Sequence, residues 1–132
     1  MLRFVKYISQ IEDSSNKLVN PLARSIYLQI KGAKLAPAIC FESLQPQHAE
    51  KANSLGADIY IVSSAKSESG IQLAYSHFPT VAKQYEMPVV FSNSVGPGDG
   101  FFSVGQSAIW DANGNIVAQL DNSEQGIITY EY

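Results

Sequence analysis

The most constraining feature of the sequence is an alternation of strand-like and helix-like segments between residues 57 and 94. Residues 57–64 (ADIYIVSS) have an almost continuous apolar centre, which a strand needs when helices cover its sheet. From Ile71 onward, apolar residues recur at the i, i+3, i+4, i+7 spacing of an amphipathic helix. Residues 87–94 (MPVVFSNS) then predict another strand. This order predicts an α/β fold.

The two predicted helices differ in how clearly the sequence marks their ends. In the first, Ser43 suits the N-cap, Pro46 suits the first turn, and Gly56 suits the position after the last turn. Pro79 lies inside the second helical pattern. We therefore expect either a kink there or a short helix that restarts with Pro79 in its first turn.

Two strand-like segments precede the first helix. Residues 24–30 and 34–41 predict an antiparallel pair joined by a turn at Lys31-Gly32. Pro37 cannot donate a hydrogen bond to a neighbouring strand, so we expect its strand to be a local edge or to bulge at that point.

The segment after residue 94 changes from alternating elements to consecutive strands. Residues 95–100 (VGPGDG) predict a loop, and residues 101–120 predict two strands joined at Asn113-Gly114, a strong hairpin signal. Residues 126–132 (GIITYEY) predict a final strand. The complete order is β-β-α-β-α-β followed by a β-meander.

The composition excludes several classes of protein. The chain has 132 residues, of which 45% are hydrophobic and 16% charged, so we expect one globular domain over residues 1–132. A net charge of −3 gives no basis for binding nucleic acid or an anionic membrane. No apolar run approaches the ~18 residues that a membrane-spanning helix needs. The single cysteine cannot form an internal disulfide, which fits a reducing cytoplasm.

Cys40, the only cysteine, is a candidate nucleophile. It ends an apolar strand just before a predicted helix, where side chains project from the sheet edge and helix-end amides favour an anion. The N–H of Phe41 can donate to an oxyanion, and the Glu42 carboxylate follows two residues after the thiol. Free cysteines are also common as small buried residues, so the structural alternative stays open.

Four segments carry a resemblance to a known family. They are KLAPAICFES (34–43), GADIYIVSSAKS (56–67), TVAKQYEMPVVFSNSVG (80–96) and SVGQSAIWDANGNIVAQLDNSEQGII (103–128). With these four segments in this order, the chain resembles the second half of a carbon–nitrogen hydrolase of the nitrilase superfamily. The resemblance implies half of an α-β-β-α sandwich: a mixed sheet with two helices on one face and a C-terminal β-meander. It also implies that the domain is truncated at its N-terminus.

The catalytic set of that family is a Cys, a Lys and a Glu. The resemblance assigns the nucleophile to Cys40 and the lysine to Lys6, in the degraded context RFVKYIS; a solvated surface lysine is the alternative. The family's general-base Glu lies in the half that this chain does not match. Glu12 and Asp13 do not fit its motif, and Glu42 matches an acid that is not the base.

Three further polar residues, Asn93, His48 and His77, have predicted positions relative to the expected site. Asn93 ends a strand near the expected pocket, where it either supports the site or caps the strand. His48 is predicted to face solvent, and His77 to lie on the polar side of its helix. No Cys/His pair has the spacing of metal ligands, so we expect no metal site, and the resemblance implies no cofactor.

The resemblance implies hydrolysis of non-peptide C–N bonds in small amides, carbamoyl compounds or nitriles through a Cys thiolate and an acyl-enzyme. The alternative is a non-catalytic homologue that acts as an oligomerising or partner-binding module. In either case we expect a homodimer or a higher homo-oligomer, because half of the family fold leaves apolar sheet surface uncovered.

Overall fold

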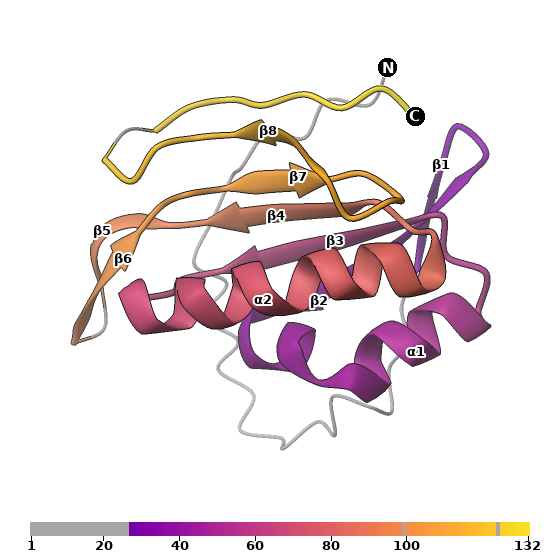
Figure 1. Ribbon diagram of the computed structural model, residues 1–132, viewed down its shortest axis with the longest axis horizontal. Coiled ribbons are helices and arrows are strands. Elements are labelled where there is room, and N and C mark those ends of the chain that lie inside the picture. Colours follow the sequence, from indigo (N-terminus) through magenta and orange to yellow (C-terminus); the bar gives the residue numbers. More distant parts are fainter. Residues whose placement is uncertain (1–26, 99, 124) are drawn as a thin grey trace.

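The computed structural model describes residues 27–98, 100–123 and 125–132. Within them, a six-stranded sheet carries two helices, and two further strands form a separate hairpin (Figure 1). The elements are β1 (Leu28–Ile30), β2 (Ala33–Ile39), the 3-10 turn η1 (Cys40–Leu44), α1 (Pro46–Ser54), β3 (Ile59–Ser64), α2 (Glu68–Tyr85), β4 (Val89–Asn93), β5 (Val95–Gly98), β6 (Phe101–Val104), β7 (Ala108–Trp110) and β8 (Ile116–Gln119).

The large sheet is mixed, as predicted. Its strand order is β1-β2-β3-β4-β7-β8. Strands β2, β3 and β4 are parallel, whereas the β1/β2, β4/β7 and β7/β8 pairs are antiparallel. The register places Ile39 opposite Ser63 and Ser64 opposite Asn93. The carboxyl ends of the three parallel strands therefore meet at one edge of the sheet, the edge where Cys40 begins η1.

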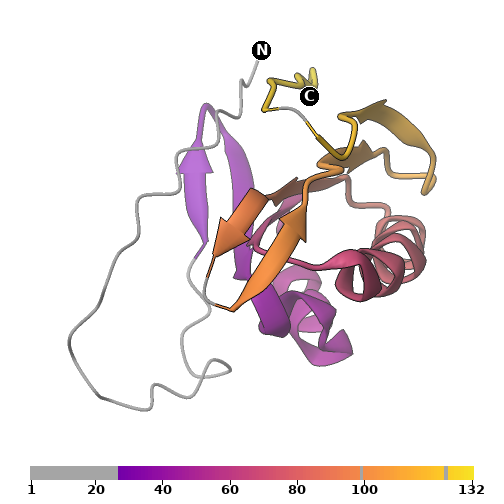
Figure 2. The same cartoon turned by 90° about the vertical axis from the view of Figure 1, so that its left-hand side faces the viewer.

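The two faces of the sheet are buried by different means. Both helices lie on the same side of the sheet (Figure 2). On this face the sheet packs against the buried face of α2. The core here includes Ala38, Tyr60, Val62, Phe91 and Trp110 from the sheet and Ile71, Phe78 and Val81 from α2. On the other face lie Ala33, Leu35, Ile59, Val90 and Ile109, with Ile128 and Tyr130 of the C-terminal segment packed against them.

Several predictions of local structure are confirmed. The first two strands form an antiparallel pair, and β7 and β8 are joined around Asn113-Gly114. Residues 101–120 nevertheless form three strands where two were predicted, because β6 is separate from β7 and pairs with β5. Among the described residues, the partners of β1 reach only as far as Leu35, so no described strand pairs with Pro37 on that side of β2. Pro46 occupies the first turn of α1, and Gly56 follows the helix with a φ of +76°.

Two predictions near the helices and the hairpin are wrong, and one alternative at Pro79 is excluded. Ser43 does not cap α1, because Cys40–Leu44 closes into its own turn and Gln45 takes the N-cap position. The second helix does not restart at Pro79, since α2 runs from Glu68 to Tyr85 and the buried side chains of Phe78 and Val81 hold both halves on the sheet; a kink at Pro79 stays a prediction. Residues 95–100 are not simply a loop, because Val95–Gly98 pairs with β6 in a hairpin.

The predicted final strand is also absent. Residues 125–132 contain only an isolated bridge at Tyr130. The alternating apolar residues of this segment have another use, because Ile128 and Tyr130 pack onto the sheet face that the helices leave open. Among the described residues, no helix combines the length and the apolar character needed to cross a membrane.

Candidate functional site

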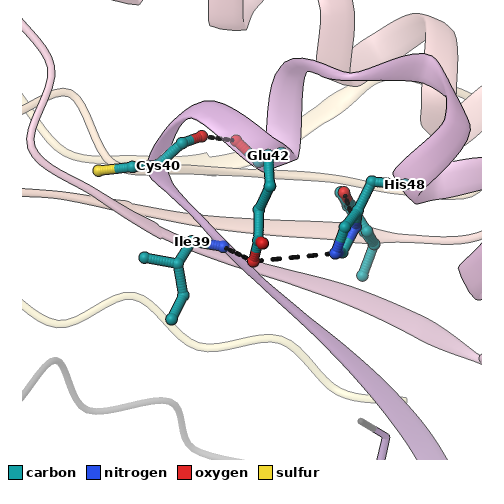
Figure 3. A network of polar contacts seen from close by, with 6 residues as sticks. Ile39, Cys40, Glu42 and His48 are labelled. Atoms are coloured by element: carbon teal, nitrogen blue, oxygen red, sulfur yellow. Dashed lines mark hydrogen bonds and ion pairs between the residues drawn. The ribbon is translucent and has the colours of Figure 1, made fainter. Parts of the chain in front are cut away.

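Cys40 occupies a strained backbone position at the carboxyl end of β2. Its φ of +48° lies in the left-handed region, which residues other than glycine seldom adopt. The Oγ of Ser43 donates to the carbonyl oxygen of Cys40 at 2.5 Å and so helps to close the turn (Figure 3). Backbone strain of this kind persists only where the surrounding structure enforces it, and it is concentrated at functional sites.

The carboxylate of Glu42 is turned away from the thiol. Its Oε1 accepts a hydrogen bond from the backbone N–H of Ile39 at 2.7 Å and lies 3.8 Å from Nε2 of His48. Figure 3 shows the sulfur of Cys40 and the Glu42 carboxylate pointing in different directions. In this arrangement Glu42 stabilises the turn that carries Cys40.

The prediction that His48 faces solvent is wrong. Its ring is partly buried beside Tyr60, and its Nδ1 lies 2.7 Å from the Tyr60 hydroxyl. Burial raises the pKa of Tyr60, and the nearby charge of Glu42 raises it further. The contacts of His48 therefore connect α1 to both η1 and β3.

Asn93 is a buried hydrogen-bonding centre at the end of β4. Its side-chain Oδ1 accepts from the Lys66 N–H at 2.7 Å and from the Ser64 hydroxyl at 3.1 Å. Its Nδ2 donates to the carbonyl oxygens of Lys66 at 3.1 Å and Gly105 at 2.9 Å. The backbone N–H of Asn93 donates to the Ser107 hydroxyl at 2.9 Å. The residue thus ties the end of β4 to the segments that follow β3 and β6.

Lys66 is a residue of this site that the sequence analysis missed. It lies just beyond the carboxyl end of β3 and is only 8% exposed. Burial lowers the pKa of Lys66, while its interaction with Cys40 raises it. Its position two residues beyond a buried strand was the available signal, since the carboxyl ends of parallel strands gather side chains at one edge.

His77 is the second ionisable residue near this edge, and it is not simply on the polar side of α2. It is half-buried, and its Nε2 is enclosed without a hydrogen-bond partner among the described residues. Burial lowers the pKa of His77, the backbone of Ser43 raises it, and the charge of Lys66 lowers it again. The structure therefore brings Lys66 and His77 to the place where η1 packs against α2.

The structure tests the remaining predicted site residues only in part. Lys6, Glu12 and Asp13 lie outside the described residues, so their predicted positions stay predictions. Phe41 follows Cys40 in η1 with an exposed side chain, and the use of its N–H as an oxyanion donor also stays a prediction. Across the part of the chain that the structure describes, no three His, Cys, Asp or Glu side chains gather as a metal site would need.

Comparison with solved structures identifies the same fold in several enzymes. A glutamine-dependent NAD+ synthetase from Acinetobacter baumannii matches 80% of this chain, over 20% of its own length, with a TM-score of 0.72 and 20% identity. Nit3 of Saccharomyces cerevisiae, a member of the nitrilase superfamily, matches 77% of this chain over 38% of its own, with a TM-score of 0.71 and 22% identity. A mutant of an amidase from Nesterenkonia sp. AN1, with the acetamide moiety of fluoroacetamide covalently added at its active-site cysteine, matches 74% of this chain over 37% of its own, with a TM-score of 0.69 and 20% identity.

Comparison of sequences leads to the family. A formamidase from Photorhabdus laumondii is 31% identical over 102 residues, which are 76% of this chain and 30% of the formamidase. The chain thus spans less than a third of the length of that relative. The carbon-nitrogen hydrolase family model matches residues 8–132. By this match over nearly its whole length, the chain belongs to the carbon-nitrogen hydrolase family.

Proposed function

We propose that this protein cleaves non-peptide C–N bonds of small amides, carbamoyl compounds or nitriles, with Cys40 as the nucleophile. The observation that carries the proposal is the strained Cys40 turn at the carboxyl edge of the sheet, in a chain of the carbon-nitrogen hydrolase family. A mutant of the Nesterenkonia amidase, which shares this fold, has the acetamide moiety of fluoroacetamide covalently added at its active-site cysteine. The formamidase relative supports small amides as the class of substrate.

The proposed reaction has two halves. In the first, the Cys40 thiolate attacks the amide carbonyl carbon, an S–C bond forms, and the carbonyl π electrons move onto oxygen. The N–H of Phe41 and a lysine stabilise this oxyanion, after which the C–N bond breaks and the amine leaves with a proton. In the second half, water attacks the thioester carbon, and the acid and the thiol are released.

Proton transfer is the step of this reaction that these residues support least. The leaving amine needs a proton and the attacking water must lose one, and a general acid–base residue typically contributes ~10²–10⁴-fold to such steps. Glu42 is engaged by the Ile39 N–H and by His48, away from the thiol. We therefore expect this 132-residue chain to acylate with an activated ester but to hydrolyse simple amides very slowly.

Intact-mass spectrometry tests the proposal. After incubation with an activated ester, we expect the wild-type chain to gain one acyl group, while Cys40→Ser gains none. Ammonia release from a panel of amides and nitriles is measured on the same samples. Sustained release that depends on Cys40 would show a base that the described residues do not reveal. Absence of both adduct and turnover would refute the catalytic proposal.

A non-catalytic, self-associating module is the second candidate. Large apolar side chains are exposed beside the candidate site and on the edge strand β8; these are Ile39, Phe41, Ile116 and Val117. Exposed apolar patches commonly mark interaction surfaces. This proposal predicts a homodimer or larger assembly in light scattering at about 100 µM protein. A stable monomer at that concentration would contradict it.

A further inference from the structure

We propose that Lys66 forms an ion pair with the Cys40 thiolate and is a further catalytic residue at this site. Its part in catalysis rests on the function proposed above. The ion pair itself concerns only the reactivity of the thiol, and it can be tested without any hydrolysis.

The sheet topology brings the two residues to the same place. Strands β2 and β3 are parallel neighbours, and Ile39 at the end of β2 lies opposite Ser63 near the end of β3. Cys40 therefore begins its turn at the level where β3 ends, and η1 contacts both β3 and α2. Lys66 follows β3 by two residues and precedes α2, so it lies on the segment that joins these two neighbours of η1.

The backbone of Lys66 is fixed from both sides. Asn93 accepts from its N–H at 2.7 Å and donates to its carbonyl oxygen at 3.1 Å. The N–H of Val104 donates to the same carbonyl at 3.1 Å. These buried bonds hold the backbone of Lys66 in one position and so limit where its side chain can reach.

The side chain of Lys66 lies along the first turn of α2. A Cβ placed on Gly70 would lie 3.1 Å from Cβ, 3.4 Å from Cγ and 3.6 Å from Cδ of Lys66. The apolar stem therefore uses the space that glycine leaves open. With this packing the residue as a whole is nine-tenths buried.

The ammonium group of Lys66 is partly desolvated, and a neighbouring negative charge stabilises such a group because desolvation disfavours its charged form. Among the described residues, no carboxylate forms an ion pair with Lys66. Two ionisable groups interact with it: Cys40, which favours the ammonium form, and His77, which can supply no negative charge. When the Cys40 thiol loses its proton to solvent, the thiolate supplies the missing charge. The same ammonium then lies beside the sulfur that attacks the substrate.

Alkylation by iodoacetamide tests the ion pair, because the thiolate is the reacting form. The sulfur forms an S–C bond and iodide leaves, and the single cysteine makes the mass change unambiguous. We compare the wild type with Lys66→Met, Lys66→Arg and the control Lys51→Met, an exposed lysine of α1. At pH 7 we expect alkylation of Lys66→Met to be about 10-fold slower or more, because removing a nearby opposite charge lowers the thiolate fraction by that order. Lys66→Arg should keep most of the rate and Lys51→Met all of it.

Other results would overturn the proposal. An unchanged rate in Lys66→Met would do so, as would a loss in Lys6→Met that Lys66→Met does not share. Circular dichroism checks that each variant is folded, and Lys66→Gln provides a second neutral side chain. The absorbance of the wild-type thiolate near 240 nm gives a measurement without substitution, and its absence at pH 7 would also overturn the ion pair. If alkylation depends on Lys66 but no ester acylates Cys40, the ion pair stands and the proposed hydrolase function fails.

Discussion

Replacing Asn93 with alanine removes the hydrogen bonds that join the end of β4 to the segments following β3 and β6. Asn93 is 2% exposed. Its side chain bonds to the backbone N–H and carbonyl of Lys66, to the hydroxyl of Ser64 and to the carbonyl of Gly105. Because alanine can neither accept nor donate these bonds, we expect a large loss of stability from a substitution that removes little apolar surface.

The size of the loss follows from which partners are left unpaired. The carbonyl oxygen of Lys66 keeps its bond from Val104, and the Ser64 hydroxyl can rotate toward another acceptor. The Lys66 N–H and the Gly105 carbonyl lose the partner that Asn93 gives them. A buried polar group without a partner costs about 1–3 kcal/mol, so Asn93→Ala should lower the free energy of unfolding by about 2–6 kcal/mol. A typical domain has only about 5–15 kcal/mol in total.

Urea unfolding followed by tryptophan fluorescence measures this loss, since the only tryptophan, Trp110, is buried in the core. Ser64→Ala removes a single bond of the network and should cost about 1 kcal/mol. Asn53→Ala, at an exposed position of α1, should change the free energy of unfolding by less than about 0.5 kcal/mol. If Asn93→Ala loses no more than Ser64→Ala does, the hydrogen bonds of Asn93 do not hold these segments together.

Three further predictions concern the core, the pH dependence of stability and the turn. Trp110→Ala should lower the free energy of unfolding by about 3–5 kcal/mol in urea titrations followed by circular dichroism, because Trp110 is buried and contacts Tyr75 edge-to-face at 5.0 Å; a loss under 1 kcal/mol would contradict this packing. Since the pKa of His77 is lowered in the folded state, the unfolded state binds the proton more readily, and the stability contributed by neutral His77 should be full above about pH 6.5 and be lost as pH falls below it. Urea titrations across this range should show a weaker pH dependence in His77→Gln, and an unchanged slope would refute the assignment. Glu42→Gln should acylate with an activated ester within a few-fold of the wild-type rate, because its carboxylate is bound to the Ile39 N–H; a loss near 100-fold would show that Glu42 takes part in proton transfer.

The sequence by itself determined the elements with a clear period. The apolar spacing from Ile71 predicted α2, and the run at 57–64 predicted β3, because these patterns record which residues face a core. Local chemistry also predicted Pro46 in the first turn of α1 and the positive φ of Gly56. Four segments taken together were enough to indicate the family, since the residues of each motif are contiguous in the chain.

Local patterns failed where one sequence feature has two uses. The alternation at 126–132 is typical of a strand, yet Ile128 and Tyr130 pack across a sheet face instead of extending its edge. The helix pattern around Pro79 indicated a kink or a restart, and burial of the face that contains Phe78 keeps α2 from restarting there. In both cases the choice depends on which surface remains to be covered, and no short window of sequence contains that information.

The tertiary structure alone decided which polar residues surround the thiol. Lys66 carries only the weak signal of following a buried strand, His77 has the sequence context of a polar helix face, and Glu42 has that of a candidate partner for the thiol. Parallel pairing of β2 with β3 and packing of α2 on η1 bring Lys66 and His77 toward Cys40, while the turn directs the Glu42 carboxylate to the Ile39 N–H. The physical reason is that a buried polar group is paired by whatever the fold brings next to it, and those neighbours come from distant parts of the chain.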